Sequence, residues 1–341
     1  MAIEKITSLQ VAKRAGVSQS AVSRVFTPGA SASAKTAKAV KKAADELGYR
    51  PNMMARAMIT GKSRIIGLVV AYLDNQFYPL ALERLSNALQ EQGYHILVFT
   101  VPNDSDRVAK VMRELLDYQV DGIITASVSI TNDLTERCAA VGIPIVMFNR
   151  AQDGRDISAV TSANVAGGRK VAQFLIASGY KRNAHISGWQ GSSTGRDRLA
   201  GFREGMRAAG MPMHGVIDGH FSREVAAQAT RDLMKSATPP DAIFVGNDHM
   251  AFAVMDTLRL ELGLRIPEDI AVVGYDDVPL AQWASYDLTT VRQPVNQMVE
   301  ATIDILLSQI NNDNIAPQRI EIDGPLMVRG SAPGQPTKDI I

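Results

Sequence analysis

Apolar residues show two different patterns of spacing along the 341-residue chain. In roughly the first fifty residues they recur at helical spacing, and from about residue 65 they gather in short continuous runs. The first series of runs predicts strands at 65–71, 95–100, 122–125 and 144–148. Helices are predicted at about 80–91, between the second and third strands with an end at 118, and at about 134–141. The second predicts strands near 160 and at 184–187, 242–245 and 270–274, with helices at about 164–178, 198–209, 224–235 and 250–262. Buried strands alternating with helices are typical of parallel sheets, so two α/β lobes are expected.

Three short helices are predicted before residue 50. Thr7 and Gln10 have the spacing of a capping box, which starts a helix running to about residue 14. Gly16 suits a tight turn, and Ser18 caps a second helix directly afterwards. Ser33 caps a third helix, which ends near residue 48. Two short helices joined by a three-residue turn containing glycine form a helix-turn-helix, whose second helix enters the DNA major groove.

The charge of the chain is unevenly distributed. Residues 1–64 contain 12 Lys and Arg against 3 Asp and Glu, a net charge of +9, whereas the remainder has a net charge of −8. A solvated basic face would account for the charge alone. Because the basic segment also contains the helix-turn-helix pattern, it is interpreted as a surface for a polyanion, namely double-stranded DNA.

The remaining composition excludes several classes of protein. No apolar run approaches the roughly 18 residues of a membrane span, so no membrane association is expected. The start of the chain lacks the pattern of a secretory signal, and Cys138 is the only cysteine, which excludes an internal disulfide. These features predict a cytoplasmic protein.

The stretch 50–59 (RPNMMARAMI) has too many apolar side chains for a solvated linker. Pro51 suits a helix start, and most of the following residues tolerate helix. An isolated helix shorter than about 12–15 residues is marginal in water. The stretch is therefore expected to be unfolded alone and helical when a partner covers it, and the DNA minor groove is the hypothesised partner.

The first sixty residues resemble the headpiece of the LacI/GalR family of bacterial transcriptional repressors. The motifs that carry this resemblance are VAKRAGVS at 11–18, VSRV at 22–25, SAKT at 33–36, LGY at 47–49, PN at 51–52 and AR at 55–56. The resemblance implies that Gln19, Ser20 and Arg24 read bases and that phosphates are contacted by Thr7, Ser8, Ser18, Ser23, Ser33 and Thr36. It also implies a hinge helix whose DNA contacts include Asn52, Ala55 and Met58. Met58 replaces the leucine that the family inserts between central base pairs, and methionine is one of the apolar wedges used there.

The resemblance extends to about residue 330. Its later motifs are NQFY at 75–78, GG at 167–168, RLAGF at 198–202, ND at 247–248, VGYDD at 273–277 and LTTV at 288–291. It implies an N-terminal all-α helix-turn-helix headpiece at 1–49, a hinge and linker at 50–64, and an α/β periplasmic-binding-protein-like core of two doubly wound lobes at 65–341. Lobe 1 is expected to contain about 65–160 and 291–320, and lobe 2 about 161–290 and 321–341.

Polar and aromatic residues recur where the predicted strands end. Parallel α/β sheets bind ligands beyond the carboxyl ends of their strands, so these residues are candidates for an effector site between the lobes, although each also fits ordinary loop chemistry. The candidates are Asp74, Asn75, Phe77, Tyr78, Asn149, Arg150, Ser192, Thr194, Arg198, Asn247, Asp248 and Asp276. The resemblance implies that Arg198 and Asp276 hold ligand hydroxyls or a carboxylate. It further implies that Phe77 or Tyr78 packs on the ligand, with Phe221 on the other side.

No motif in the chain indicates catalysis or a cofactor. The sequence TGKS at 60–63 resembles the end of a P-loop, but Arg56 stands where that motif needs glycine. The five histidines lack the spacing of a metal site, and no serine lies in a G-x-S-x-G motif. The chain is therefore not expected to be an enzyme and is expected to hold no metal.

These features together predict a ligand-responsive transcriptional regulator, most simply a repressor, that binds a palindromic operator as a homodimer. The tail after residue 329 shows no heptads, so the tetramer-forming coiled coil of some relatives is not expected. The expected effector is a sugar or sugar derivative, and two arginines in one cleft raise the alternative of a sugar acid or phosphate. Two other functions stay open, namely a sugar-modifying enzyme fused to a DNA anchor and a ligand-independent architectural DNA binder.

Overall fold

The structure of the chain is a computed structural model that describes residues 6–27, 30–50, 61–101, 105–128, 132–154, 156–312 and 315–334. Contacts within the chain divide it into two compact units, Met1–Ser63 and Arg64–Ile341. The first unit contains the three-helix headpiece and we call the second unit the core, and each is described by itself.

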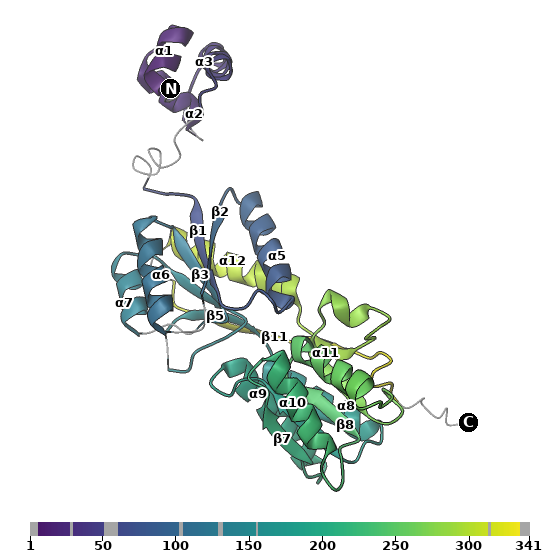
Figure 1. The fold of residues 1–341 in the computed structure, drawn as a ribbon. Helices are drawn as coiled ribbons and strands as arrows, with labels where there is room; N and C mark the ends of the chain where they lie inside the picture. The colour runs from purple at the N-terminus through teal and green to yellow at the C-terminus, as the bar shows by residue number, and fades with distance from the viewer. Residues whose placement is uncertain are drawn as a thin grey trace, which may run out of the picture. The chain divides into compact units, whose positions relative to one another are not determined.

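The headpiece is a bundle of α1 (Ser8–Ala15), α2 (Gln19–Phe26) and α3 (Ala34–Leu47) (Figure 1). The predicted capping box is confirmed, since the Thr7 hydroxyl accepts from the Gln10 N–H and the Gln10 side chain accepts from the Thr7 N–H at 2.7 Å. Ser18 and Ser33 cap α2 and α3 as predicted, since their hydroxyls accept from the Ala21 and Thr36 N–H groups. Gly16 and Gly48 end α1 and α3 with φ of 66° and 67°, a conformation that glycine adopts without strain.

The three helices of the headpiece enclose a small core of their own. Its fully buried side chains are Val11, Ala12, Val22, Val40, Ala43 and Ala44. Phe26 and Tyr49 close one side of this core, with ring centroids 5.9 Å apart. The polar residues of α2 are left on the outside of the bundle.

The first lobe of the core is a parallel sheet with helices on both faces. Its strands are β1 (Ile65–Val70), β2 (His95–Thr100), β3 (Gly122–Ala126), β4 (Ile145–Phe148), β5 (Ser158–Ser162) and β11 (Arg319–Ile322), in the order β2-β1-β3-β4-β5-β11. Helices α5 (Phe77–Glu91) and α12 (Val295–Asn311) cover one face, and α6 (Ser105–Asp117) and α7 (Asn132–Ala140) cover the other (Figure 1).

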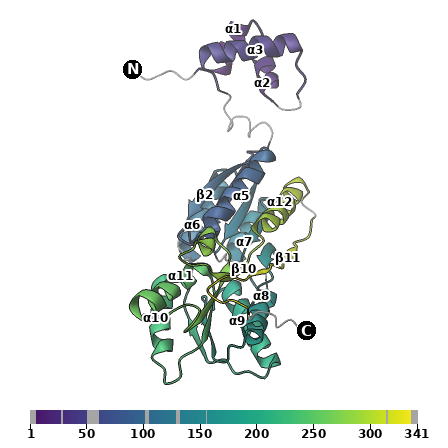
Figure 2. The ribbon, with the colours of Figure 1, turned by 90° about the vertical axis from the view of Figure 1, so that its right-hand side faces the viewer.

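The second lobe repeats this arrangement. Its strands are β6 (Asn183–Ser187), β7 (Gly215–Asp218), β8 (Ala242–Val245), β9 (Ala271–Asp276), β10 (Thr289–Arg292) and β12 (Leu326–Met327), in the order β7-β6-β8-β9-β10-β12. Only β12 runs antiparallel to its neighbour among the described strands. Helices α8 (Asn164–Ala177) and α9 (Ser193–Ala208) cover one face, and α10 (Arg223–Met234) and α11 (Asp248–Asp256) cover the other (Figure 2). A π-helical turn (Thr257–Glu261) continues α11, and a short 3₁₀ helix (Pro279–Gln282) follows β9.

The central strands are apolar throughout because both faces of each sheet are covered. In β8, Ala242 and Phe244 pack under α8 and α9, whereas Ile243 and Val245 pack under α10 and α11. Side chains of a strand alternate between its faces, so a strand covered on both sides needs an unbroken apolar run. The two doubly wound lobes expected from the sequence are therefore confirmed.

In the described residues the chain passes between the lobes three times, after β5, after β10 and after β11. Neither lobe is therefore a single continuous segment of the chain. The carboxyl end of β5 leads directly into the start of α8, and that of β10 into the start of α12.

Two helices begin three or more residues earlier than the sequence pattern predicted. Helix α5 starts at Phe77 because the Asn75 side chain accepts from the Phe77 N–H at 3.1 Å, and Pro79 is tolerated in a first turn. Helix α9 starts at Ser193 because Ser192 caps it. The edge strand β7 was not predicted, since it is partly exposed and lacks a buried apolar run. The elements after residue 288, namely β10, α12, β11 and β12, were not predicted either. Among the described residues, no helix has the length and apolarity needed to cross a membrane.

Candidate functional site

The exposed face of α2 carries the residues predicted to read bases. Gln19, Ser20 and Arg24 all face solvent, and so does Ser23. The Gln19 amide donates to the Ser8 hydroxyl at 2.9 Å, which joins a predicted base contact to a predicted phosphate contact. The structure thus brings residues of α1 and α2 together on one polar surface.

Three predicted phosphate contacts lie at helix N-termini. Thr7, Ser18 and Ser33 are the N-caps of the three helices, and Thr36 lies one turn inside α3 with its hydroxyl 2.8 Å from that of Ser33. Free N–H groups and the helix dipole make such termini favourable for phosphate. The remaining predicted contacts, Asn52, Ala55 and Met58, lie outside the described residues.

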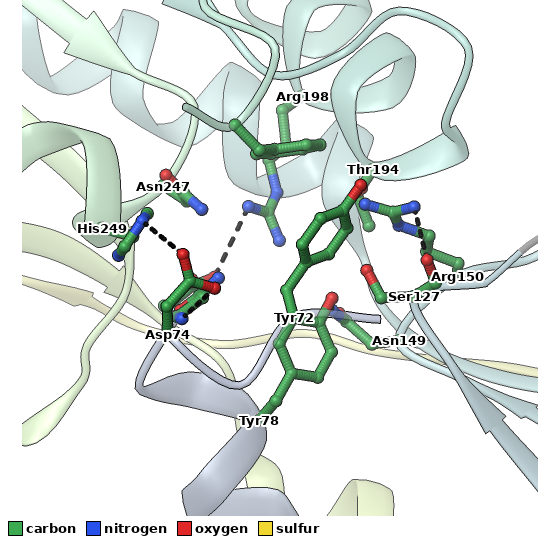
Figure 3. A pocket seen from close by; sticks show the side chains of 13 residues that line it. Tyr72, Asp74, Tyr78, Ser127, Asn149, Arg150, Thr194, Arg198, Asn247 and His249 are labelled. Atoms are coloured by element: carbon green, nitrogen blue, oxygen red, sulfur yellow. Dashed lines mark hydrogen bonds and ion pairs between the residues drawn. The ribbon is translucent and has the colours of Figure 1, made fainter. Parts of the chain in front are cut away.

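A polar cleft lies between the two lobes of the core, and we call it the interlobe cleft (Figure 3). The empty space between its walls is about 380 Å³, a volume that includes the part open to solvent. Its lining consists of Tyr72, Asp74, Asn75, Tyr78, Ser127, Asn149, Arg150, Thr194, Arg198, Phe221, Asn247, His249 and Asp276. Most of these residues follow strands β1, β3, β4, β8 and β9, as the strand-end argument predicts.

The structure does not bring Phe77 and Ser192 to the cleft. Phe77 is 2% exposed and packs in the core of the first lobe, with its ring stacked 6.1 Å from that of Phe148. The Ser192 hydroxyl is occupied as the cap of α9, where it accepts from the Gly195 N–H and donates to the Trp189 carbonyl. The fully buried Asp248 lies behind Asp276 rather than in the lining.

Three lining residues were not identified from the sequence. Ser127 directly follows β3, so the strand-end rule could have found it. Tyr72 lies two residues beyond β1 and could have been found in the same way. His249 begins α11 beside Asp248, and its Nε2 lies 3.6 Å from Asp74 Oδ2 of the other lobe. No sequence signal marked this contact between the lobes.

Arg198 is fixed from several sides. Its Nε donates to Asn164 Oδ1 at 2.9 Å and its Nη1 donates to the Gly246 carbonyl at 2.7 Å. The guanidinium carbon lies 3.7 Å from the centroid of the Tyr275 ring, and Nη1 lies 3.4 Å from Asp276 Oδ1. These contacts hold a buried cation rigidly at the cleft, which favours recognition of ligand oxygens without further ordering.

Glycines hold the helix that carries Arg198 against its neighbour. A Cβ added to Gly168 of α8 would overlap the Arg198 carbonyl oxygen, and one added to Gly201 of α9 would overlap the Val165 carbonyl oxygen. Helices α8 and α9 therefore pack backbone against backbone. This close approach places Asn164, at the start of α8, within hydrogen-bonding distance of the Arg198 side chain.

Two buried carboxyl groups lie beside Arg198. Burial raises the pKa of Asp248 to about 7, and the negative charge of Asp276 adds to the rise. Burial also raises the pKa of Asp276 to about 6, although Arg198 and a hydrogen bond from Gln293 oppose it. Since both pKa values exceed the ordinary 3.8, the folded protein retains protons that the unfolded chain releases. Their stabilising contribution is therefore complete below about pH 4 and is lost as the pH rises through about 6–7.

Backbone strain gathers at the interlobe cleft. Of nine non-glycine residues with positive φ in the described chain, four line it: Ser127 at 66°, Asn149 at 68°, Phe221 at 57° and Asp276 at 129°. Such conformations cost free energy and persist only where the surrounding structure enforces them. Their concentration here marks the cleft as a functional site.

The lining can recognise a polyhydroxylated ring. Tyr72, Tyr78 and Phe221 provide aromatic surfaces, and amide, carboxyl and guanidinium groups lie between them. Planar polar groups that donate and accept in pairs match adjacent hydroxyls of a sugar. Among the described residues, no group of three or more His, Cys, Asp or Glu side chains is arranged to hold a metal ion.

Comparison with known proteins gives matches over both units. Residues 9–52 match the family described as "Bacterial regulatory proteins, lacI family", and residues 172–332 match the "Periplasmic binding protein-like domain". The ribose operon repressor of Escherichia coli (strain K12) is 32% identical over 331 residues, which cover 96% of this chain and 99% of that protein. The HTH-type transcriptional regulator CelR of Thermobifida fusca is 34% identical over 330 residues, which cover 94% of this chain and 96% of that protein.

Solved structures give the same result. A transcriptional regulator CelR–cellobiose complex has a TM-score of 0.73 and 33% identity, and covers 96% of this chain and 100% of its own. A lac repressor dimer bound to operator and the anti-inducer ONPF has a TM-score of 0.87 and 25% identity, and covers 97% and 100%. With similarity of this extent over both the helix-turn-helix headpiece and the two-lobed core, the chain belongs to the lacI family of bacterial regulatory proteins.

Proposed function

We propose that the chain is a ligand-responsive transcriptional repressor that binds a palindromic DNA operator as a homodimer and holds a sugar or sugar derivative in the interlobe cleft. One headpiece presents one recognition helix, so a two-fold symmetric operator requires two copies. Similarity to three regulators supports this proposal: the ribose operon repressor, the CelR–cellobiose complex and the operator-bound lac repressor dimer.

The observation that carries the proposal is the combination of two sites in one chain. The headpiece presents a polar face of α2 with Gln19, Ser20 and Arg24 exposed, within a segment of net charge +9. The core presents a strained, polar and aromatic cleft of about 380 Å³. A DNA reader and a small-molecule site in one protein form the basis of ligand-controlled DNA binding.

We further propose that residues 1–49 form the DNA-binding headpiece, 50–64 a hinge helix and linker, and 65–341 the effector-binding and dimerisation core. The division of contacts between Ser63 and Arg64 supports the last boundary. The protein works as a binding protein rather than an enzyme, in keeping with its repressor relatives. Its place is the cytoplasm, where bacterial operator DNA lies.

The test is operator binding in the presence of a sugar panel. An operator is first selected from a randomised duplex library with the full-length protein, and its affinity is then measured by fluorescence anisotropy. One sugar of the panel should change this affinity by about 5–150-fold, a coupling of about 1–3 kcal/mol. Unchanged affinity across the panel, with no rise in melting temperature, would favour a ligand-independent architectural binder. Chemical conversion of a sugar by the protein would favour the enzyme.

In the proposed mechanism, the effector changes the relative position of the two lobes and thereby the helicity of the hinge, residues 50–59. We expect Met58→Gly to remove most operator bending and to weaken operator affinity about tenfold, about 1.4 kcal/mol, because the apolar wedge is lost. Ligand binding to the core should be unchanged.

Bending is measured by fluorescence resonance energy transfer between the ends of the operator, with Met53→Gly as the matched control. Unaltered bending and affinity in Met58→Gly would reduce the hinge to a passive tether.

A further inference from the structure

The two arginines that line the interlobe cleft differ in how their charge is balanced. Arg198 lies 3.4 Å from a carboxylate oxygen of Asp276 and donates to two further oxygen atoms. Arg150 donates from Nη1 to the Ser127 carbonyl at 2.9 Å, but no carboxylate of the described residues lies within ion-pair distance of its guanidinium. Arg150 is nevertheless only 6% exposed. A buried charge is unfavourable unless an opposite charge pairs with it.

Aromatic rings hold the guanidinium of Arg150 without neutralising it. Its Cζ lies 5.9 Å from the ring centroid of Tyr72 and 5.5 Å from that of Phe221. Such contacts stabilise a cation and fix the plane of the guanidinium, but they leave its full charge in place. The arrangement therefore orients Arg150 toward a group that the protein itself does not provide.

The guanidinium and two other side chains of the cleft lining have polar atoms without a partner. Among the described buried side chains, Arg150 Nε, Ser127 Oγ and Asn149 Oδ1 make no hydrogen bond, and all three residues line the cleft (Figure 3). The Asn149 amide donates to the Tyr78 hydroxyl at 3.0 Å. Because a tyrosine hydroxyl donates as well as it accepts, this amide can turn over and present its NH₂ group instead. Two donors and one adaptable amide are therefore available in the lining of this cleft.

Two acidic groups near this position have an arginine partner, since Asp276 is paired with Arg198 and Asp153 lies 2.6 Å from Arg196. The third, Asp74, has an exposed side chain and lies 3.6 Å from His249, whose pKa burial lowers. Thr194, in the first turn of α9, also lines the cleft, and this first turn contains no acidic residue. The positive end of a 16-residue helix therefore adds to the field of Arg150 instead of opposing it.

We propose that the effector carries an anionic group, a carboxylate or a phosphate, that binds against Arg150 with hydrogen bonds from Ser127 and Asn149. The sugar ring then lies toward Asn247, Arg198 and Asp276. The effector class is thus a sugar acid or sugar phosphate rather than a neutral sugar. This inference rests on the proposed function, since it concerns the same cleft.

The experiment compares the wild type with Arg150→Gln and Arg207→Gln in the full-length protein. Gln keeps hydrogen-bonding capacity at position 150 but removes the charge, and Arg207 is an exposed arginine of α9 that serves as the matched control. Melting temperatures are titrated with inorganic phosphate and with acetate, each at ionic strength balanced with chloride. Matched sugars follow in the same assay: ribose with ribose 5-phosphate, and galactose with galacturonate. Operator affinity is measured with each of the four.

We expect one of the two anions to stabilise the wild type and Arg207→Gln, with an apparent Kd about tenfold weaker in Arg150→Gln. Preference for phosphate assigns the group as a phosphate, and preference for acetate assigns it as a carboxylate. Within a matched pair, the anionic sugar should bind more tightly than the neutral one, and Arg150→Gln should abolish that preference. A cooperative melt of Arg150→Gln shows that the variant is folded.

Equal protection of wild type and Arg150→Gln by both anions would overturn the inference. So would a neutral sugar that binds more tightly than its charged counterpart and changes operator affinity, although that result would leave the proposed function intact. Anion binding that depends on Arg150, with operator affinity unchanged by all four sugars, would instead support the anion site and count against the proposed sugar response.

Discussion

Replacing Arg198 with methionine should lower the free energy of unfolding by about 3–5 kcal/mol at about pH 8, because the Asp276 carboxylate would stay buried without its cation. The Asn164 side chain and the Gly246 carbonyl would lose a donor at the same time. The loss should be smaller at about pH 5. There Asp276 takes up a proton and leaves no uncompensated charge, because burial raises its pKa to about 6 even with Arg198 present, and removal of Arg198 raises it further. Denaturant unfolding at both pH values measures the difference.

Arg169→Met is the matched control for this substitution. Arg169 pairs with Glu204 at 2.6 Å and joins the same two helices, but both side chains are more than 40% exposed. Ion pairs of this kind contribute about 0–1 kcal/mol, so the control should be nearly neutral. An equal loss at about pH 5 and pH 8 in Arg198→Met would show that packing, rather than the uncompensated charge of Asp276, accounts for the instability.

Replacing Arg24 with alanine should weaken binding to the selected operator by about 10–100-fold and should change binding to random DNA far less. The exposed position of Arg24 on α2 allows a bidentate contact to a guanine edge, which is worth about 1–3 kcal/mol of discrimination. Anisotropy titrations against operator and random duplexes at several salt concentrations measure both affinities. The same selection repeated with the variant should yield an operator with relaxed sequence at one position of each half-site.

Lys38→Ala provides the comparison for Arg24→Ala. Lys38 is exposed on α3, outside the recognition helix, and its charge contributes to attraction for phosphates in general. Its loss should affect operator and random DNA alike and should reduce the salt dependence of binding. If Arg24→Ala gave the same uniform loss, Arg24 would be a phosphate contact rather than a reader of bases.

Local signals made much of the fold predictable. The three N-caps of the headpiece, the glycine stops and the apolar runs of the central strands depend on residues close in sequence, and the structure confirms them. The strand-end rule also located most of the cleft lining, since ten of the thirteen residues named for the effector site lie there. That rule works because parallel strands place their carboxyl ends at one edge of the sheet.

Choices between neighbouring residues were not predictable. Phe77 and Tyr78 are adjacent in the first turn of α5, and only the packing of Phe77 on Phe148 decides which ring faces the cleft. Tyr78 reaches it, and its hydroxyl meets Asn149. Likewise, whether a serine caps a helix or faces a ligand depends on where the helix begins, as Ser192 shows. The hydrogen-bond partners of Arg198 come from α8 and from the end of β8, so they could not be predicted from the residues near Arg198 in the sequence.

The three passages of the chain between the lobes also decide when the protein can fold during its synthesis. The headpiece is complete by about residue 50, whereas the first lobe lacks its edge strand until β11 has been made and the second lacks β12 until a few residues later. At about 5–20 residues per second, on the order of 15–55 s separate these events on the ribosome. A nascent or prematurely terminated chain would thus contain a complete headpiece joined to a core that lacks its last strands. Such a chain can meet DNA before it can respond to any metabolite, so control by the effector begins only when synthesis is nearly complete.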